Sequence, residues 1–254
     1  MRGPALVAWQ VRFEQKQFWR SPQSAFFTFA FPLVFLVVFG TINRGQTVAE
    51  LGGIPYDQFF IPSIIAFGLM SACYTNLAIG LATRREAGIL KRLHVTPLPS
   101  WAFFGGLAGN ALVVAVLSAA ITTTLGVTAY GVHVPYRLLP LAVGLGLGAV
   151  TFGALGTAVS ALVPNAEAAP AIVNFPFFVL LFLSGTFFPT PAGSVVERIG
   201  DVFPLAHLNR VVLAAFDPRE RGTGLHADDV LVLLAWAVGA GAVAVRRFRW
   251  EPRR

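Results

Sequence analysis

Residues 83–99 read TRREAGILKRLHVTPLP, and this short basic stretch lies between two long apolar runs. Ile89, Leu90 and Leu93 fall at helical spacing, which predicts the apolar face of an amphipathic helix from residue 84 to residue 93. The basic residues expected on the opposite face are Arg84, Arg85, Lys91 and Arg92. The two prolines at the end of the stretch stop the helix, because proline lacks an N–H group and disfavours helix in the residue before it. By pattern alone, the stretch is as typical of an ordinary cytoplasmic loop as of a docking element, since such loops are rich in Lys and Arg.

The composition is that of a membrane protein. Of the 254 residues, 56% are hydrophobic and 12% are charged, which is about half the charged fraction of an average soluble domain. The net charge of +7 would suit a nucleic-acid-binding protein only if it gathered on one exposed face. It is spread among loops and tails instead, so we expect membrane lipid around the chain and no nucleic acid. The single cysteine, Cys73, excludes an intrachain disulfide.

Six apolar runs are each near the roughly 20 residues that cross a hydrocarbon core. They lie at about 24–43, 59–82, 101–130, 138–163, 168–188 and 229–247. The predicted fold is therefore an all-α membrane protein with six transmembrane helices. The fourth run carries a ladder of small residues, Ala149, Gly153, Thr157 and Ala161, beside Gly144 and Gly148. Such a ladder predicts close helix packing, which we expect within one chain rather than between subunits.

Proline and charge add detail to these runs. Pro32 lies in the first run, and Pro170 and Pro176 lie in the fifth. A proline inside a span frees a backbone carbonyl, which a neighbouring helix, a hydroxyl group or water must then satisfy. No run carries an Asp, Glu, Lys or Arg away from its ends, which argues against a proton- or ion-coupled carrier.

The distribution of charge predicts the topology. With the N-terminus in the cytoplasm, 13 of the 19 Lys and Arg residues fall on the cytoplasmic side and 6 on the outer side, whereas 8 of the 12 acidic residues fall outside. Short cytoplasmic loops are enriched in Lys and Arg. We therefore expect a multi-pass protein of the plasma membrane with both termini in the cytoplasm. The membrane would be the inner membrane or cell membrane of a bacterium, and we expect no cleaved signal peptide.

Two segments outside the runs are also expected to be helical. Residues 5–20 predict an amphipathic helix that lies in the membrane interface, with Leu6, Trp9 and Phe13 on one stripe. The longest connection, residues 189–228, contains half-apolar sequence divided at Pro204. Its two helices are too short to span, so we expect them to be re-entrant or interfacial on the outer side.

The sequence carries no recognisable catalytic chemistry. Lys16 and Lys91 are the only lysines and neither follows a glycine, so there is no phosphate-binding loop for ATP. The four histidines are isolated, and no metal-ligand spacing surrounds them. The sequence shows no combination of nucleophile, base and acid that would suggest a catalytic triad. We therefore expect a chain that transports or senses something, without an enzyme activity, cofactor or metal of its own.

Three passages, in this order along the chain, resemble the permease subunit of a type-2 ABC exporter. Residues 86–98 are similar to that family's E-x-G-x-x-(K/R)-(R/L)-L-x-x-(T/S)-P-L segment after the second span. Residues 183–189, LSGTFFP, resemble the S-G-x-x-F-P that closes the fifth span, and residues 203–207, FPLAH, match the outer proline-containing segment before the sixth. Together with the N-terminal helix, the resemblance covers essentially the whole chain as one transmembrane domain, residues 1–254.

The resemblance implies a role for each part. The segment 83–99 would be a cytoplasmic coupling helix that docks in a groove of a separate ATPase subunit, which would bind ATP and Mg²⁺ and make the complex an ATP-hydrolysing translocase. Two permease chains, identical or different, would work together. The residues implied in ATPase coupling are Arg84, Arg85, Glu86, Lys91 and Arg92. The residues expected to line a substrate path between subunits are Tyr74, Asn76, Asn174, Phe175 and Phe178.

The substrate class and two further functions stay open. Spans rich in Phe and poor in charge favour an apolar or amphipathic compound, such as a drug, an antibiotic or a lipid-like product. A glycan-exporting permease is an alternative within the same family. A non-transporting membrane subunit that docks a cytosolic partner is an alternative of a different class.

Overall fold

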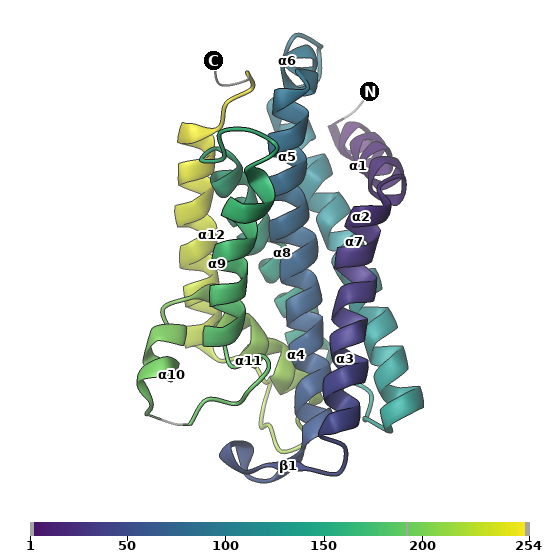
Figure 1. Ribbon diagram of the computed structural model, residues 1–254, viewed down its shortest axis with the longest axis vertical. Helices are drawn as coiled ribbons and strands as arrows, with labels where there is room; N and C mark the ends of the chain where they lie inside the picture. The colour runs from purple at the N-terminus through teal and green to yellow at the C-terminus, as the bar shows by residue number, and fades with distance from the viewer. Residues whose placement is uncertain (1–2, 192, 252–254) are drawn as a thin grey trace.

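The computed structural model describes residues 3–191 and 193–251, and its regular structure is almost entirely helical (Figure 1). The helices that run along the long axis are η1 (Phe26–Ala30) with α3 (Phe31–Ile42), α4 (Tyr56–Met70) with η3 (Ser71–Thr75) and α5 (Asn76–Glu86), α7 (Ser100–Tyr130), α8 (Leu138–Ser160), α9 (Ala169–Leu183) and α12 (Ala227–Arg247). The shorter elements are α1 (Gly3–Trp19), α2 (Pro22–Ala25), β1 (Thr47–Val48), η2 (Ala49–Leu51), β2 (Ile54–Pro55), α6 (Ile89–His94), α10 (Val195–Gly200) and α11 (Pro204–Phe216). Residues 1–2, 192 and 252–254 of the predicted single domain lie outside the described residues.

Apolar helices stand at all six predicted runs, but they differ in length. Within the described residues, four are long and apolar enough to cross a membrane: Tyr56–Glu86, Ser100–Tyr130, Leu138–Ser160 and Ala227–Arg247. The helices at the first and fifth runs, Phe26–Ile42 and Ala169–Leu183, are shorter. The chain is therefore an all-α protein with four candidate spans by length and composition, and a count of six stays a prediction.

The proline in the first run has the predicted consequence. A π-helical turn precedes Pro32, and in it the N–H of Phe31 donates to the carbonyl of Phe26 five residues back. The next carbonyl, that of Phe27, faces the Pro32 nitrogen, which has no hydrogen to donate. The hydroxyl of Ser71 in η3 donates to this carbonyl at 3.1 Å. A neighbouring helix thus satisfies the group that the proline frees.

The small residues of α8 pack within the chain, as predicted. A Cβ atom on Gly156 would lie 2.6 Å from the backbone oxygen of Tyr74, and one on Gly148 would lie within 3.2 Å of the side chains of Leu208 and Leu69. The helix formed by α4, η3 and α5 and the helix α11 therefore approach α8 closely at these glycines. Among the glycines of α8, the closest backbone approach is at Gly156, which the predicted ladder did not include.

The long helix Tyr56–Glu86 lies in the middle of the bundle, and α4 is buried along nearly its whole length. It packs against α3, α7, α8 and α11. Its Phe60 and Phe67 side chains are fully buried and contact the ring of Phe187 from the segment after α9. These contacts place the core around α4.

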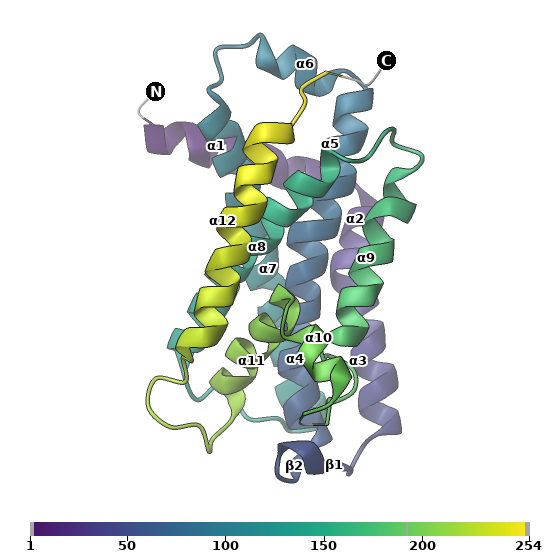
Figure 2. The same ribbon diagram turned by 90° about the vertical axis from the view of Figure 1, so that its left-hand side faces the viewer.

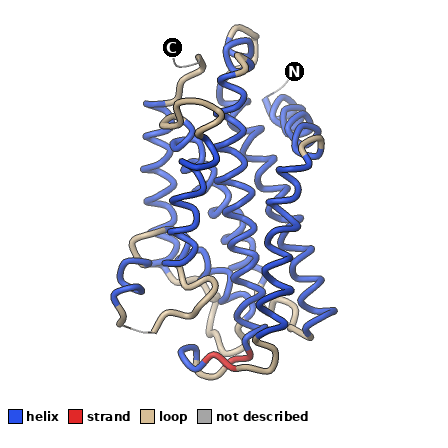
Figure 3. Tube along the Cα trace, viewed as in Figure 1, coloured by secondary structure: helices blue, strands red, loops and turns tan. Residues whose placement is uncertain are grey.

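The short elements gather at the two ends of the bundle. The turn of α6 and both described chain ends lie at one end, and the small β1–β2 hairpin lies at the other (Figures 1 and 3). We call these the α6 end and the hairpin end. Two short helices occupy the predicted outer segment, and α11 is buried against α4, α8 and α12. Both termini share one end, as the charge count requires, and the side of the membrane on which it lies stays a prediction.

Helix α1 lies across the bundle at the α6 end instead of running along it (Figure 2). Its buried residues are Gln10, Glu14 and Phe18, while Trp9 and Phe13 of the predicted apolar stripe are exposed and stack on each other. The exposed stripe suits a helix in the membrane interface. Its inner face is polar, which the sequence did not indicate.

Candidate functional site

The segment 83–99 folds differently from the single amphipathic helix that we predicted. Helix α5 ends at Glu86, and the separate six-residue helix α6 begins at Ile89. Between them, Gly88 has φ +68°, in the left-handed region that glycine adopts without steric cost. The chain therefore turns at Gly88, and Arg84 and Arg85 belong to the end of the long helix rather than to α6.

Arg84 binds α1. Its two terminal nitrogens donate to the two carboxylate oxygens of Glu14 at 3.0 and 2.7 Å. The Glu14 side chain is 2% exposed and also accepts a hydrogen bond from Gln10 at 3.0 Å. Such a two-point contact fixes orientation as well as distance, so this pair holds α1 against α5.

Arg85 and Glu86 bind the connection between α8 and α9. Arg85 is buried and donates to the carbonyl of Ser160 at 2.8 Å and to the carbonyl of Val163. The carboxylate of Glu86 accepts from the backbone N–H of Ala166. Arg84, Arg85 and Glu86 thus bind other helices and connections of their own chain, and their role in coupling stays a prediction.

Lys91 and Arg92 lie on the exposed surface of α6. The Lys91 side chain is 63% exposed and lies 3.3 Å from the carboxylate of Glu251. Arg92 is exposed and donates to the carbonyl of Ala87 at 3.2 Å. Leu90 is fully buried beneath them, whereas Ile89 is exposed. Helix α6 therefore offers a mixed basic and apolar outer face, anchored by one leucine.

The C-terminal segment braces α6, which the sequence did not indicate. The Trp250 ring stacks on the His94 ring at a centroid distance of 4.8 Å. It also lies 5.5 Å from the ring of Phe103 and 6.1 Å from that of Phe104, both in the first turn of α7. Trp250 thus joins the end of α6 to the start of α7.

The five residues expected on a substrate path do not form one site. Tyr74 is buried, and its hydroxyl donates to the carbonyl of Val173 at 3.2 Å, which joins η3 to α9. Phe175 and Phe178 are exposed on α9. Only Asn76 and Asn174 lie in one cleft. Their role in a substrate path stays a prediction.

This cleft, of about 460 Å³, lies at the α6 end between α1, the α2–η1 turn, α5, α7 and α9. Its polar lining includes Ser21, Ser24, Thr75, Asn76, Asn110 and Asn174. The Asn76 amide donates to the hydroxyl of Thr28 at 2.5 Å. Sequence reasoning missed Thr75 and Asn110, because a lone polar residue in an apolar run carries no signal of what it faces.

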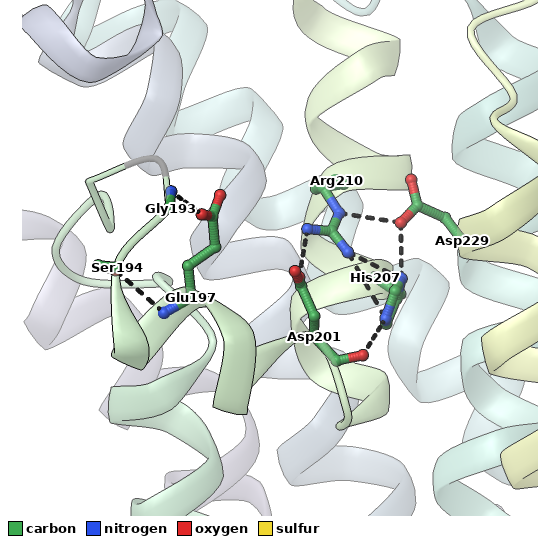
Figure 4. Close-up of polar contacts among 7 residues, drawn as sticks. All are labelled: Gly193, Ser194, Glu197, Asp201, His207, Arg210 and Asp229. Atoms are coloured by element: carbon green, nitrogen blue, oxygen red, sulfur yellow. Dashed lines mark hydrogen bonds and ion pairs between the residues drawn. The ribbon is translucent and has the colours of Figure 1, made fainter.

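The hairpin end holds a second polar cluster, which also went unpredicted (Figure 4). His207 of α11 shares a 2.7 Å hydrogen bond with Asp229 of α12 and a 2.8 Å one with the carbonyl of Asp201. Arg210 donates to Asp229 at 2.9 Å and to the carboxylate of Asp201 at 2.7 Å. The cluster ties α11 to α12 and to the turn after α10, which gives it a structural role.

Comparison with known proteins adds the family. The family model described as ABC-2 type transporter matches residues 6–216. The chain is similar to the probable multidrug ABC transporter permease YbhR of Escherichia coli K12, at 36% identity over 77 residues that cover 30% of this chain and 21% of that protein. It is also similar to the inner membrane transport permease YadH of Escherichia coli K12, at 21% identity over 158 residues that cover 61% of this chain and 60% of that protein. The chain thus spans less than two thirds of the length of either relative.

Proposed function

The chain belongs to the ABC-2 type transporter family, and from this premise we propose that it is the membrane-spanning permease subunit of an ATP-driven exporter. It would be a single multi-pass domain of a bacterial inner membrane, with the α6 end in the cytoplasm. A separate ATPase subunit would bind ATP and Mg²⁺, and a second permease chain would complete the transporter. The permease names of its relatives support this function.

The observation that carries the proposal is the exposed helix α6 at the end of the bundle. Helix α6 stands between α5 and α7, beyond the level of the neighbouring helix ends (Figure 1). Its exposed residues Ile89, Lys91 and Arg92 are free of the core, while Leu90 fixes it to the bundle. A short helix held between two long ones can pass a rigid-body motion of a docked ATPase into the membrane.

The proposed substrate is an apolar or amphipathic compound. Among the described lining residues of the cleft, the charged side chains are Glu14 and Arg84, and they are paired with each other. The remaining lining is polar but uncharged, or apolar. A site of this kind binds a molecule with apolar surface and few polar groups without a countercharge.

The proposal is tested by purifying the tagged chain from its native membrane in mild detergent and identifying the proteins that co-purify. We expect a stoichiometric ATPase subunit with a phosphate-binding loop. A preparation with no such subunit would overturn the proposal and favour a scaffold.

The docking surface is tested with the double variant Lys91→Glu and Arg92→Glu. Arg221→Glu is the matched control, because Arg221 is an exposed cation in the connection between α11 and α12. We expect the double variant to lose the ATPase subunit and the control to retain it. These two residues suit the test better than Glu86 because both are exposed on α6, whereas Glu86 binds the connection between α8 and α9 through the backbone N–H of Ala166.

A further inference from the structure

Two side chains of the cleft at the α6 end lack the partners that buried polar groups normally have. Among the described residues, the hydroxyl oxygen of Thr75 and the amide oxygen of Asn110 are buried and accept or donate no hydrogen bond. Buried polar groups in proteins are almost always hydrogen-bonded, so each exception needs an explanation. Both residues line the same cleft.

Several helical threonines of this chain satisfy their hydroxyl groups within their own helix. Thr83, Thr151 and Thr157 each donate to the carbonyl four residues earlier, at 3.0, 2.8 and 2.8 Å. This is the ordinary way in which a helical threonine satisfies its hydroxyl group. Thr75 lies at the end of the π-helical turn η3, and its buried hydroxyl group makes no such hydrogen bond.

The charges around the cleft are balanced. Glu14 and Arg84 are the charged residues of its described lining, and they contact each other at 2.7 Å. A cationic or anionic group in the cleft would lose its hydration without gaining a countercharge, which is costly in a buried place. An uncharged group that donates and accepts hydrogen bonds meets no such penalty.

The cleft also has an apolar part to its lining. Phe18, Phe27, Leu107 and Val114 enclose the cleft beside its hydroxyl and amide groups. The cleft also lies against α1, whose exposed Trp9 suits a membrane interface. A bound molecule would therefore have its polar group at the level of α1 and its apolar part among these side chains.

We propose that this cleft binds the uncharged hydroxyl- or amide-bearing head group of an amphipathic molecule. The proposal rests on the proposed export function and narrows its substrate class. Thr75 and Asn110 donate and accept hydrogen bonds to the head group, together with Asn174 on the opposite helix, α9. The apolar lining holds the first part of the chain attached to it.

The test uses a cysteine reporter in the cleft. Gly80 lines the cleft, and a Cβ atom there would meet nothing within 4 Å, so Gly80→Cys is sterically allowed. Cys73 is buried and is replaced by alanine. The purified chain in phosphatidylcholine nanodiscs is labelled with a maleimide, and the labelling rate is measured with three dodecyl probes that carry a glucoside, a trimethylammonium or a sulfate head. Glucose without the dodecyl chain is the fourth probe.

We expect the dodecyl glucoside to slow labelling at a concentration where the two charged probes and free glucose do not. Replacing Thr75 by Val and Asn174 by Leu together should weaken that protection about tenfold, because both hydrogen bonds to the head group are lost. Thr124→Val is the control, because Thr124 lies on α7 outside the cleft and donates to its own helix at 2.8 Å.

Four results would overturn the proposal. They are equal protection by all three head groups, equal protection by free glucose, no protection by any probe, and a reporter that does not react at all. The first three compare probes on one folded protein, so they stand even if the double variant fails to fold. Binding requires neither an ATPase nor transport, so the proposed function can fail while the cleft still binds its head group.

Discussion

The close approach of α8 to η3 at Gly156 can be tested with one methyl group. In Gly156→Ala, the new Cβ atom would lie 2.6 Å from the carbonyl oxygen of Tyr74 and 3.1 Å from that of Cys73. Both are backbone atoms of the π-helical turn η3 and cannot rotate away, so α8 must shift. Gly146→Ala is the matched control on the same helix, because its Cβ atom would meet nothing within 4 Å.

The difference between the two variants isolates the packing cost. Both replace glycine by alanine inside α8, so both gain about 1 kcal/mol of helix propensity. Overpacking of a well-packed interior costs about 1–3 kcal/mol, and only Gly156→Ala should incur it. For a chain of this size, the melting temperature falls by about 2–4 °C for each kcal/mol, so Gly156→Ala should melt roughly 2–12 °C below Gly146→Ala.

The assay is thermal unfolding in one detergent, read as the loss of the monodisperse peak after heating. Equal melting temperatures for the two variants would refute the close approach of α8 and η3. A lower melting temperature for Gly146→Ala alone would mean that α8 packs against the bundle with the face that carries Gly146 and not with the face that carries Gly156.

Three further predictions concern polar and aromatic contacts. Glu14→Ala should destabilise the chain by less than the roughly 3–5 kcal/mol that is lost when a fully buried ion pair is broken, because the Arg84 side chain is 19% exposed. The double variant Glu14→Arg and Arg84→Glu, which exchanges the two charges, should restore part of the lost stability in the same melting assay. The hydrogen bond from the Arg219 side chain lowers the pKa of Asp217 in the folded chain. This bond therefore stabilises the loop fully at pH values above the ordinary carboxyl pKa of about 3.9. The stabilisation is lost as the pH falls through the lower pKa that Asp217 has in the folded chain. The protection factors of the backbone amides of residues 217–225, taken relative to the intrinsic exchange rate at each pH, should therefore fall at acid pH in the native chain and lose this dependence in Asp217→Asn. Trp250→Ala should speed exchange of the α6 amides by up to about tenfold, as expected for loss of aromatic contacts of roughly 0.5–1.5 kcal/mol, whereas Trp250→Phe should keep most of the protection.

The helices could be predicted from the sequence because their signals are local. Runs of apolar residues near the length of a span predicted the six apolar helices, and Pro204 marked the division between α10 and α11. The break between α5 and α6 also had a local signal, Gly88. The spacing of Ile89, Leu90 and Leu93 suited a continuous helix equally well, whereas in the structure Gly88 is left-handed and Leu90 is buried.

The partners of the charged residues could not be predicted, because they come from distant parts of the chain. Arg84 meets Glu14 across 70 residues, and Arg85 meets the carbonyl of Ser160 across 75. Within its own segment, each of these charged residues has the sequence pattern of an exposed residue. The same holds for Asn110 and Thr75, which line one cleft only when η3 and α7 pack together. Local periodicity identifies which residues are apolar, and tertiary packing decides which polar residues meet.

The positions of these charges bear on how a docked ATPase could move the bundle. Helix α5 continues through η3 into α4 without a break, so it forms one rod from Tyr56 to Glu86. Arg84 fastens the end of this rod to α1, and Arg85 fastens it to the end of α8. We infer that a displacement of α6 would reach α1, α5 and α8 together, because bending the rod alone would break the contacts of Arg84 and Arg85. On the proposed function, Lys91 and Arg92 would receive the motion at the surface, and the residues at the end of α5 would distribute it to the walls of the cleft beside α1.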